Sequence, residues 1–192
     1  MLYKAGYYNM LLNGPNGTSL QYGDQQGGSS YGDRRPSLAN WFQDDELAFI
    51  SSFYRRGKEP EWTSKLFPDS RLSLLRSDWS QNALFAFTHV RGGGQHAHAD
   101  DNAMTVMAYQ RVLLNDAGIM TYTASDPQRV WGQSTRAHNT VEINNRSQNI
   151  GSAGTLDLKG LSMIGSAMGS MILSVRAPRL ILALITAVPL PL

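Results

Sequence analysis

The sequence predicts an α+β fold in which helices come first and strands follow. Apolar residues recur with helical spacing from residue 2 to residue 12, and Asn13-Gly14-Pro15 then supplies a strong helix stop. A second helical stripe begins after Pro36, whereas from Phe67 onward the apolar residues form short runs that alternate with polar ones. Because the helical pattern precedes the strand pattern, the two kinds of element are expected in separate parts of the fold.

The helix after Pro36 is expected to run to about Arg56-Gly57, since proline suits a first helical turn. Its apolar stripe is expected in the core and consists of Leu38, Trp41, Phe42, Phe49 and Phe53. Residues 13–35 are rich in Gly, Asn and Ser and are expected to form a loop. Strands are expected at residues 82–90, 104–109, 111–114 and 140–143.

The tail, residues 158–192, differs sharply in composition from the rest of the chain. It contains three basic residues and no acid, and it ends in an apolar run that Pro189 and Pro191 interrupt. That run is shorter than the about 20 residues that a membrane-spanning helix needs, so we expect no membrane span. A buried strand is one interpretation of the run, and a truncated or misread gene end is the other.

Composition restricts the classes of function. The chain of 192 residues has no cysteine, which excludes a disulfide framework and a thiolate metal site, so any metal must be held by His, Asp or Glu. The net charge is +2, but the tail supplies three positive charges and leaves residues 1–157 close to neutral. Nucleic-acid binding is therefore not expected. No basic segment followed by an apolar stretch opens the chain, so no secretory signal is expected in it.

The densest polar cluster lies between two predicted strands, in residues 92–101 (GGGQHAHADD). In an extended chain, residues two apart point to the same side, which would place His96, His98 and Asp100 on one face. Two histidines in such a pair can hold a metal ion, or they can simply lie on the surface of a glycine-rich turn. His89, at the end of an alternating strand, is instead expected to be a core histidine.

Two further residues favour a metal site. Asp116 lies at the end of an apolar strand, and His138 lies at the start of the next apolar run. Two neutral imidazoles and one carboxylate form a common zinc ligand set, with water in the fourth position.

Together these motifs give the chain a resemblance to the heparinase II/III family. The matching segments, in family order and spacing, are residues 67–70 (FPDS), 75–79 (LRSDW), 94–100 (GQHAHAD), 114–118 (LNDAG) and 136–141 (RAHNTV). They cover roughly residues 60–148. Upstream, residues 13–17 (NGPNG) and 22–24 (YGD) are similar to the segment that links the α/α toroid of that family to its antiparallel β-sandwich.

The resemblance implies a domain organisation. Residues 1–60 would be the end of the helical toroid and the linker, residues 61–157 would be a partial heparinase II/III-like β-sandwich, and residues 158–192 would be an atypical tail. The fold expected on this basis is α+β, with remnant helices of an α/α toroid followed by an antiparallel β-sandwich.

The resemblance also implies an activity for the whole protein. Enzymes of this family are polysaccharide lyases, and alginate lyases and heparinases are typical: a base removes the C5 proton of a uronate, and a toroid tyrosine upstream of this chain acts on the departing C4 oxygen. His96 would be the catalytic histidine, and His98, Asp116 and His138 would bind a zinc ion that organises the site. The partner would be an acidic polysaccharide or oligosaccharide, and the location would be periplasmic or secreted.

Arg129 and Arg136 flank the predicted metal residues and are candidates for gripping uronate carboxylates, although both could be ordinary surface residues. Tyr122 and Trp131 could stack on sugar rings or could be core aromatics. Two alternative functions stay open. One is a metal-dependent hydrolase in which the ion activates water, and the other is a non-catalytic glycan-binding or structural β-sandwich module.

Overall fold

The computed structural model describes residues 11–25, 36–90, 96–150, 170–174 and 182–186. In chain order, the first elements are α2 (Pro36–Phe42), α3 (Asp45–Ser51), β1 (Lys65–Phe67), β2 (Leu72–Arg76) and β3 (Phe85–His89). They are followed by β4 (Met104–Ala108), β5 (Arg111–Leu114), α4 (Pro127–Gly132), the 3-10 turn η1 (Thr135–Ala137), β6 (Ser170–Ser174) and β7 (Leu182–Thr186). The predicted order of helices before strands is confirmed for α2, α3 and β1–β5, whereas α4 and η1 follow these strands.

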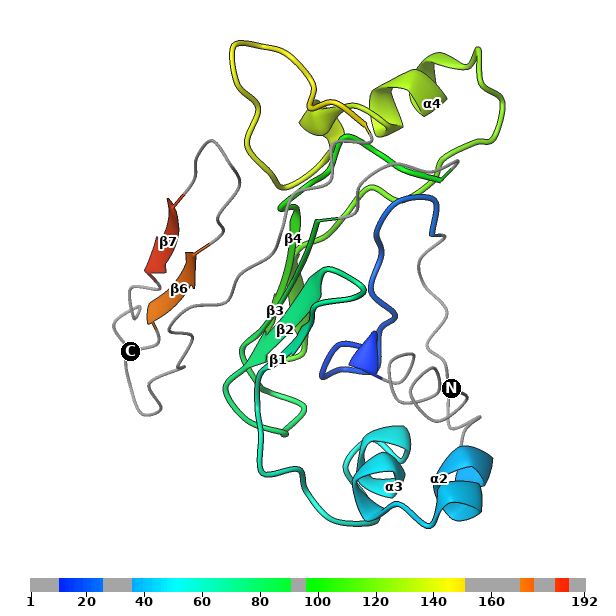
Figure 1. Cartoon of the computed structure of the whole chain (residues 1–192), viewed down its shortest axis with the longest axis vertical. Helices are drawn as coiled ribbons and strands as arrows, with labels where there is room; N and C mark the ends of the chain where they lie inside the picture. Colours follow the sequence, from blue (N-terminus) through cyan, green and yellow to red (C-terminus); the bar gives the residue numbers. More distant parts are fainter. Residues whose placement is uncertain (1–10, 26–35, 91–95, 151–169, 175–181, 187–192) are drawn as a thin grey trace.

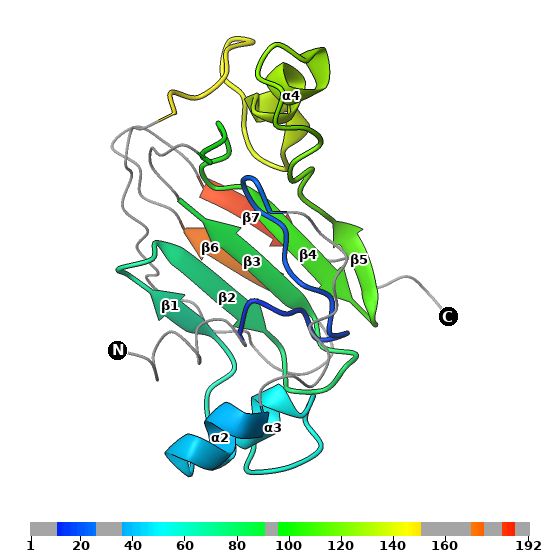
Figure 2. The same cartoon turned by 90° about the vertical axis from the view of Figure 1, so that its right-hand side faces the viewer.

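The centre of the fold is a five-stranded antiparallel sheet with the order β1-β2-β3-β4-β5 (Figure 2). Every residue of β2 and β3 is buried, so both faces of the middle of the sheet are covered. β6 and β7 form a separate antiparallel pair, which Figures 1 and 2 place on the side of the sheet opposite residues 11–25. β7 lies within the apolar run of the tail, so part of that run forms a strand.

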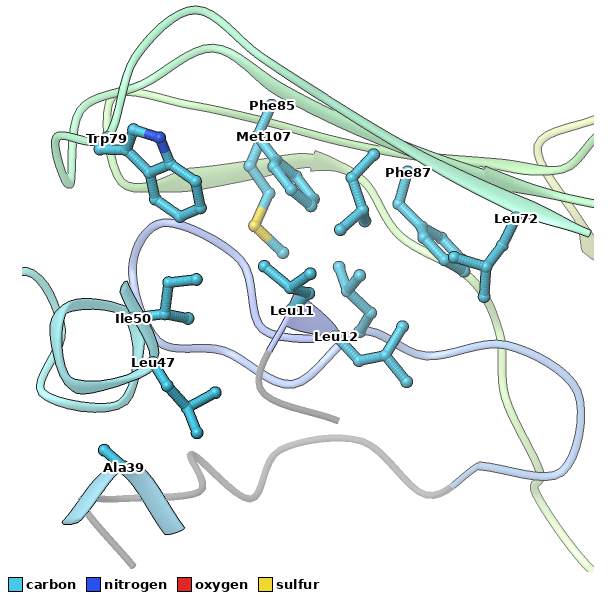
Figure 3. Close-up of a cluster of buried hydrophobic side chains, with 12 residues drawn as sticks. Leu11, Leu12, Ala39, Leu47, Ile50, Leu72, Trp79, Phe85, Phe87 and Met107 are labelled. Atoms are coloured by element: carbon cyan, nitrogen blue, oxygen red, sulfur yellow. The ribbon is translucent and has the colours of Figure 1, made fainter. Parts of the chain in front are cut away.

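The core lies between the sheet and the segment formed by residues 11–25 (Figure 3). Leu11 and Leu12 lie between Ile50 and Leu47 of α3 on one side and the sheet on the other. Gly14 allows this segment to approach the sheet, because a Cβ there would lie 2.2 Å from the sulfur of Met107. The predicted helix at residues 2–12 falls outside the described residues except for its last two.

The prediction of one helix from Pro36 to about Arg56 is wrong. Gln43 has a φ of 52°, and Asp44 then begins a new helix because its side chain accepts a hydrogen bond from the Leu47 amide at 2.8 Å. Helix α3 ends at Ser51, and Phe53 and Tyr54 have positive φ values of 53° and 70°. Leu38 and Phe42 of α2 and Phe49 of α3 pack on the core as expected. The core prediction is wrong for Trp41, which is 71% exposed, and Phe53 lies beyond the end of α3.

The prediction of a strand at residues 140–143 is also wrong. Val141 and Ile143 are 45% and 52% exposed, and only an isolated bridge joins Ile143 to Arg146 across Asn144 and Asn145, which both have a φ of 54°. The segment is instead tied to the loop between β3 and β4, since the Thr140 hydroxyl donates to the Asp101 carbonyl at 2.7 Å. This attachment turns the chain back on itself and brings His138 to the same end of the sheet.

Candidate metal centre

All four histidines of the chain gather at one end of the five-stranded sheet, and each contacts a carboxylate. His89 ends β3, His96 and His98 lie in the loop between β3 and β4, and His138 follows η1. The carboxylates come from three places: Asp24 before the helices, Asp100 in the same loop, and Asp116 just beyond β5. Antiparallel pairing of β3, β4 and β5 explains why the ends of these strands meet here.

The loop from residue 96 to residue 103 is held by the segment that contains α4 and η1. The Ala99 amide donates to the Gln133 carbonyl at 2.9 Å, and the Thr135 hydroxyl donates to the Ala99 carbonyl at 2.7 Å. The extended conformation expected for His96, His98 and Asp100 is not part of a strand, because these bonds hold the loop to the segment of α4 and η1 instead. The two imidazoles do still converge, since both face Asp24.

His98, Asp100 and His138 form a compact group with the properties of a metal site. All three are buried, and one ligand atom from each lies within 4.8 Å of the others. The rings of His98 and His138 are 5.2 Å apart between centroids. His98 Nδ1, His138 Nε2 and Asp100 Oδ1 are buried atoms with no hydrogen-bond partner among the described residues. Unpaired buried polar atoms are costly, so this donor set fits a zinc ion, which would satisfy them.

Asp116 contacts the same group through His138. Its Oδ2 lies 2.7 Å from His138 Nδ1, and its Oδ1 accepts a hydrogen bond from the Gly118 amide at 2.9 Å. The predicted residues His98, Asp116 and His138 are therefore brought together, and Asp100 is an additional carboxylate that the metal prediction had not included. Carboxylate oxygens in contact with a metal-binding imidazole are also a common way of orienting the ring.

The buried histidine expected in the core is His89, which is 2% exposed. Its Nε2 lies 3.1 Å from Asp100 Oδ2. This contact occupies one oxygen of Asp100 and leaves the other toward the group formed with His98 and His138.

The protonation states of the group differ from residue to residue. Burial lowers the pKa of His98 below its usual value and outweighs the opposing hydrogen bond with Asp24. Burial acts in the same direction on His138, but its hydrogen bond and charge attraction with Asp116 outweigh burial and raise its pKa. Burial would raise the pKa of Asp100, yet the hydrogen bond from His89 and the nearby imidazoles lower it. A neutral His98 beside an ionised Asp100 suits a metal ion, because metal ligands must be deprotonated.

Asp24, like Asp100, is a residue of the site to which the sequence analysis gave no role. Its side chain is 4% exposed and contacts His96, His98 and Arg129. Burial alone would raise the pKa of Asp24, but the hydrogen bonds from these three side chains hold it well below its usual range. The only signal in the sequence was its place in the YGD segment at residues 22–24, which resembles the family linker.

The two candidate arginines have different surroundings. Both terminal nitrogens of Arg129 face Asp24, with Nη2 2.9 Å from Oδ2, and its side chain is only 9% exposed. Arg136 is 57% exposed and its Nε lies 2.9 Å from both oxygens of Glu142. Their predicted role in substrate binding stays a prediction, and of the two guanidinium groups that of Arg136 is the more accessible.

His96 differs from the other histidines because its side chain is 59% exposed. Tyr122 meets its ring edge-on at 6.3 Å between centroids, and Tyr122 and Trp131 are themselves 63% and 48% exposed. The aromatic residues considered for sugar stacking thus lie outside the core. This part of the surface presents an imidazole and aromatic rings beside the buried histidine and carboxylate group.

The fold is thus a domain built on an antiparallel sheet that carries a histidine and carboxylate group at one end. Sequence comparison identifies the family to which this domain belongs. The profile of the family "Heparinase II/III-like, C-terminal" matches residues 59–165, more than half of the chain. The chain therefore belongs to this family, and the resemblance seen in its motifs is confirmed.

Solved structures with the same fold are found among polysaccharide lyases. The chain superimposes on heparinase III with a TM-score of 0.71 at 19% identity, covering 89% of this chain and 29% of that protein. For heparan sulfate lyase HepC from Pedobacter heparinus the TM-score is 0.68 at 20% identity, covering 85% of this chain and 26% of that protein. For the heparinase III-BT4657 gene product the values are 0.71 and 17%, covering 86% and 26%.

This chain thus spans between a quarter and a third of the length of these lyases. A search of curated protein sequences gave no match. Within the described part of the chain, no helix is both long enough and apolar enough to cross a membrane.

Proposed function

We propose that this domain belongs to a polysaccharide lyase that cleaves uronate-containing polysaccharide by β-elimination, and that its histidine and carboxylate group holds a zinc ion beside the substrate cleft. The observation that carries the proposal is the group of His98, Asp100 and His138, with three unpaired buried ligand atoms, in a heparinase II/III-like domain. The location of this group at the end of the sheet, next to the exposed side chain of His96, supports a site that combines a buried metal centre with an accessible imidazole.

The β-elimination reaction determines which roles the residues of this chain would have. The C5 proton of a uronate is weakly acidic, and an enolate-like charge develops on the carboxylate as the proton leaves. Groups that stabilise this charge more strongly in the transition state than in the ground state accelerate the reaction. We assign His96 to the substrate side, where its imidazole can exchange a proton with the substrate, and Arg136 to the carboxylate. A zinc ion at His98 and His138 would supply structural organisation to the loop that carries His96.

The zinc proposal has two histidines and two candidate carboxylates. The family resemblance favours Asp116 as the carboxylate ligand. The structure favours Asp100, because its Oδ1 is buried and has no hydrogen-bond partner among the described residues. Zinc takes carboxylate oxygens at about 2.0–2.2 Å. We expect Asp116→Asn to lose stoichiometric zinc if Asp116 is the ligand, and Asp100→Asn to lose it if Asp100 is the ligand. Zinc measured per protein in both variants, with Asp69→Asn in an exposed turn as control, decides between them.

Arg136→Ala is expected to weaken retention on a heparin or alginate column. Its exposed guanidinium can pair with a carboxylate or sulfate of the glycan, and the loss should be larger at low salt because salt screens exposed charges. Arg111→Ala, on the exposed strand β5, removes the same charge away from the site and should retain normally. An equal loss of retention in both variants would show that the effect comes from the net charge of the protein, and it would contradict a role for Arg136 in the site.

Product analysis tests the activity itself. The complete gene product is incubated with heparan sulfate, heparin and alginate, and both reducing ends and near-ultraviolet absorbance are followed. A lyase generates a 4,5-unsaturated uronate that absorbs in the near ultraviolet with each new reducing end. Reducing ends without that absorbance would establish a metal-dependent hydrolase instead, and binding without either product would establish a glycan-binding module.

A further inference from the structure

Asp24 makes four contacts that use both of its oxygens. Oδ1 lies 2.8 Å from His98 Nε2 and also contacts Arg129 Nη1. Oδ2 lies 2.8 Å from His96 Nδ1 and 2.9 Å from Arg129 Nη2. A carboxylate accepts about four hydrogen bonds, so these contacts fill it.

The direction of the two histidine bonds follows from the arginine. A guanidinium is always protonated and only donates, so the carboxylate that it grips in two places acts as an acceptor. Each histidine nitrogen that faces Asp24 must then carry the hydrogen. His96 faces Asp24 with Nδ1, whereas His98 faces it with Nε2. The same carboxylate therefore stabilises the Nδ1–H tautomer of one histidine and the Nε2–H tautomer of the other, two residues along the chain.

We propose that Asp24 is a positioning residue that fixes His96 as its Nδ1–H tautomer and His98 as its Nε2–H tautomer. For His98 this leaves the Nδ1 lone pair as the ligand atom, and Nδ1 is a buried atom without a partner among the described residues. For His96 it leaves Nε2 as the acceptor nitrogen of an exposed ring. The roles of these two atoms rest on the proposed function, whereas the tautomers do not.

The same pattern recurs at His138 and supplies an internal reference. Asp116 Oδ2 faces His138 Nδ1 at 2.7 Å and leaves Nε2 as the buried atom without a described partner. Where Asp100 rather than Asp116 is the carboxylate ligand, a carboxylate behind each of the two imidazoles would thus select the nitrogen that is presented to the ion. Such outer partners typically change metal affinity by about 10–100-fold when removed. Asp24 differs from Asp116 because it joins residues 11–25 to the loop and serves a second histidine at the same time.

The competing explanation is that Asp24 only anchors residues 11–25 to Arg129. Three variants separate the two: Asp24→Asn and Asp24→Ala, which remove the charged acceptor, and Arg129→Met, which keeps it. Histidine tautomers are read from long-range proton–nitrogen correlation spectra of nitrogen-15-labelled, metal-free protein. The pH is raised above the usual histidine pKa of about 6.5 until the spectra show neutral rings, because Asp116 raises the pKa of His138. Asp69→Asn, in an exposed turn, is the control for an aspartate-to-amide change.

We expect the wild-type protein and Arg129→Met to show His96 as Nδ1–H, and Asp24→Ala to shift it to Nε2–H, the form that an imidazole side chain favours in water. In Asp24→Asn the remaining amide oxygen can still accept from Nδ1–H. His138 should stay Nδ1–H in every variant, which certifies that the site is folded. Zinc affinity should fall about 10–100-fold in Asp24→Asn and stay unchanged in Asp69→Asn. His96 as Nε2–H in the wild-type protein, or as Nδ1–H in folded Asp24→Ala, would overturn the proposal. Failure of the wild-type protein to bind zinc would count against the metal site alone, because the tautomers are measured without metal.

Discussion

Replacing Arg129 with Met should lower the free energy of unfolding by about 3 kcal/mol. The substitution leaves the buried carboxylate of Asp24 without its two guanidinium contacts, and breaking a buried ion pair by removing one partner typically costs about 3–5 kcal/mol. We expect the lower end of this range because His96 and His98 still donate to Asp24. Denaturant unfolding followed by circular dichroism measures the difference.

Arg136→Met provides the matched control for this prediction. Arg136 also pairs with a carboxylate, that of Glu142, but its side chain is 57% exposed. Exposed ion pairs contribute about 0–1 kcal/mol, so this variant should unfold close to the wild-type midpoint. Equal losses of stability in the two variants would contradict the assignment of Arg129 and Asp24 as a buried pair that joins the two parts of the site.

Removal of zinc with a chelator should have an effect of similar or greater size. A ligand that binds only the folded protein stabilises it by about 4.1 kcal/mol when its free concentration is about 1,000 times its dissociation constant. The unfolded chain has no cysteine and few histidines with which to compete for the ion. Thermal unfolding with chelator, and again after zinc is added back, should show a reversible shift of the midpoint.

Magnesium added in place of zinc serves as the control. Magnesium prefers octahedral oxygen ligands, and two imidazoles with a carboxylate do not supply them. The midpoint should therefore recover with zinc and not with magnesium. Full recovery with both ions would contradict a site built on His98 and His138.

The sequence was sufficient for the parts of the fold that depend on local pattern. Alternation from residue 82 to residue 90 predicted a strand, and β3 is found within that range. The break between α2 and α3 was missed because the apolar stripe continues across it, although Asp44 followed by Asp45 and Glu46 is a typical helix start. The strand expected at 140–143 is wrong because Val141 and Ile143 are exposed and, within the described residues, only an isolated bridge involves this segment.

Only those site residues that lie in family-like motifs could be predicted from the sequence. His98, Asp116 and His138 could be grouped because their spacing resembles that of a family, and the structure brings them together. The contact between Asp24 and Arg129 joins residues 105 positions apart, and nothing in the local sequence marks either residue as the partner of the other. Pairings of this kind depend on how residues 11–25 cross the sheet, which only the assembled fold establishes.

Zinc content in three proteins tests the central claim most directly. Elemental analysis of the wild-type protein, His98→Ala and His96→Ala should give about one zinc per chain in the wild-type protein and in His96→Ala, and none in His98→Ala. The reason is that His98 is buried beside His138, whereas His96 is exposed and contacts Asp24 rather than His138. A well-folded wild-type protein without zinc, or a loss of zinc in His96→Ala as complete as in His98→Ala, would contradict the account.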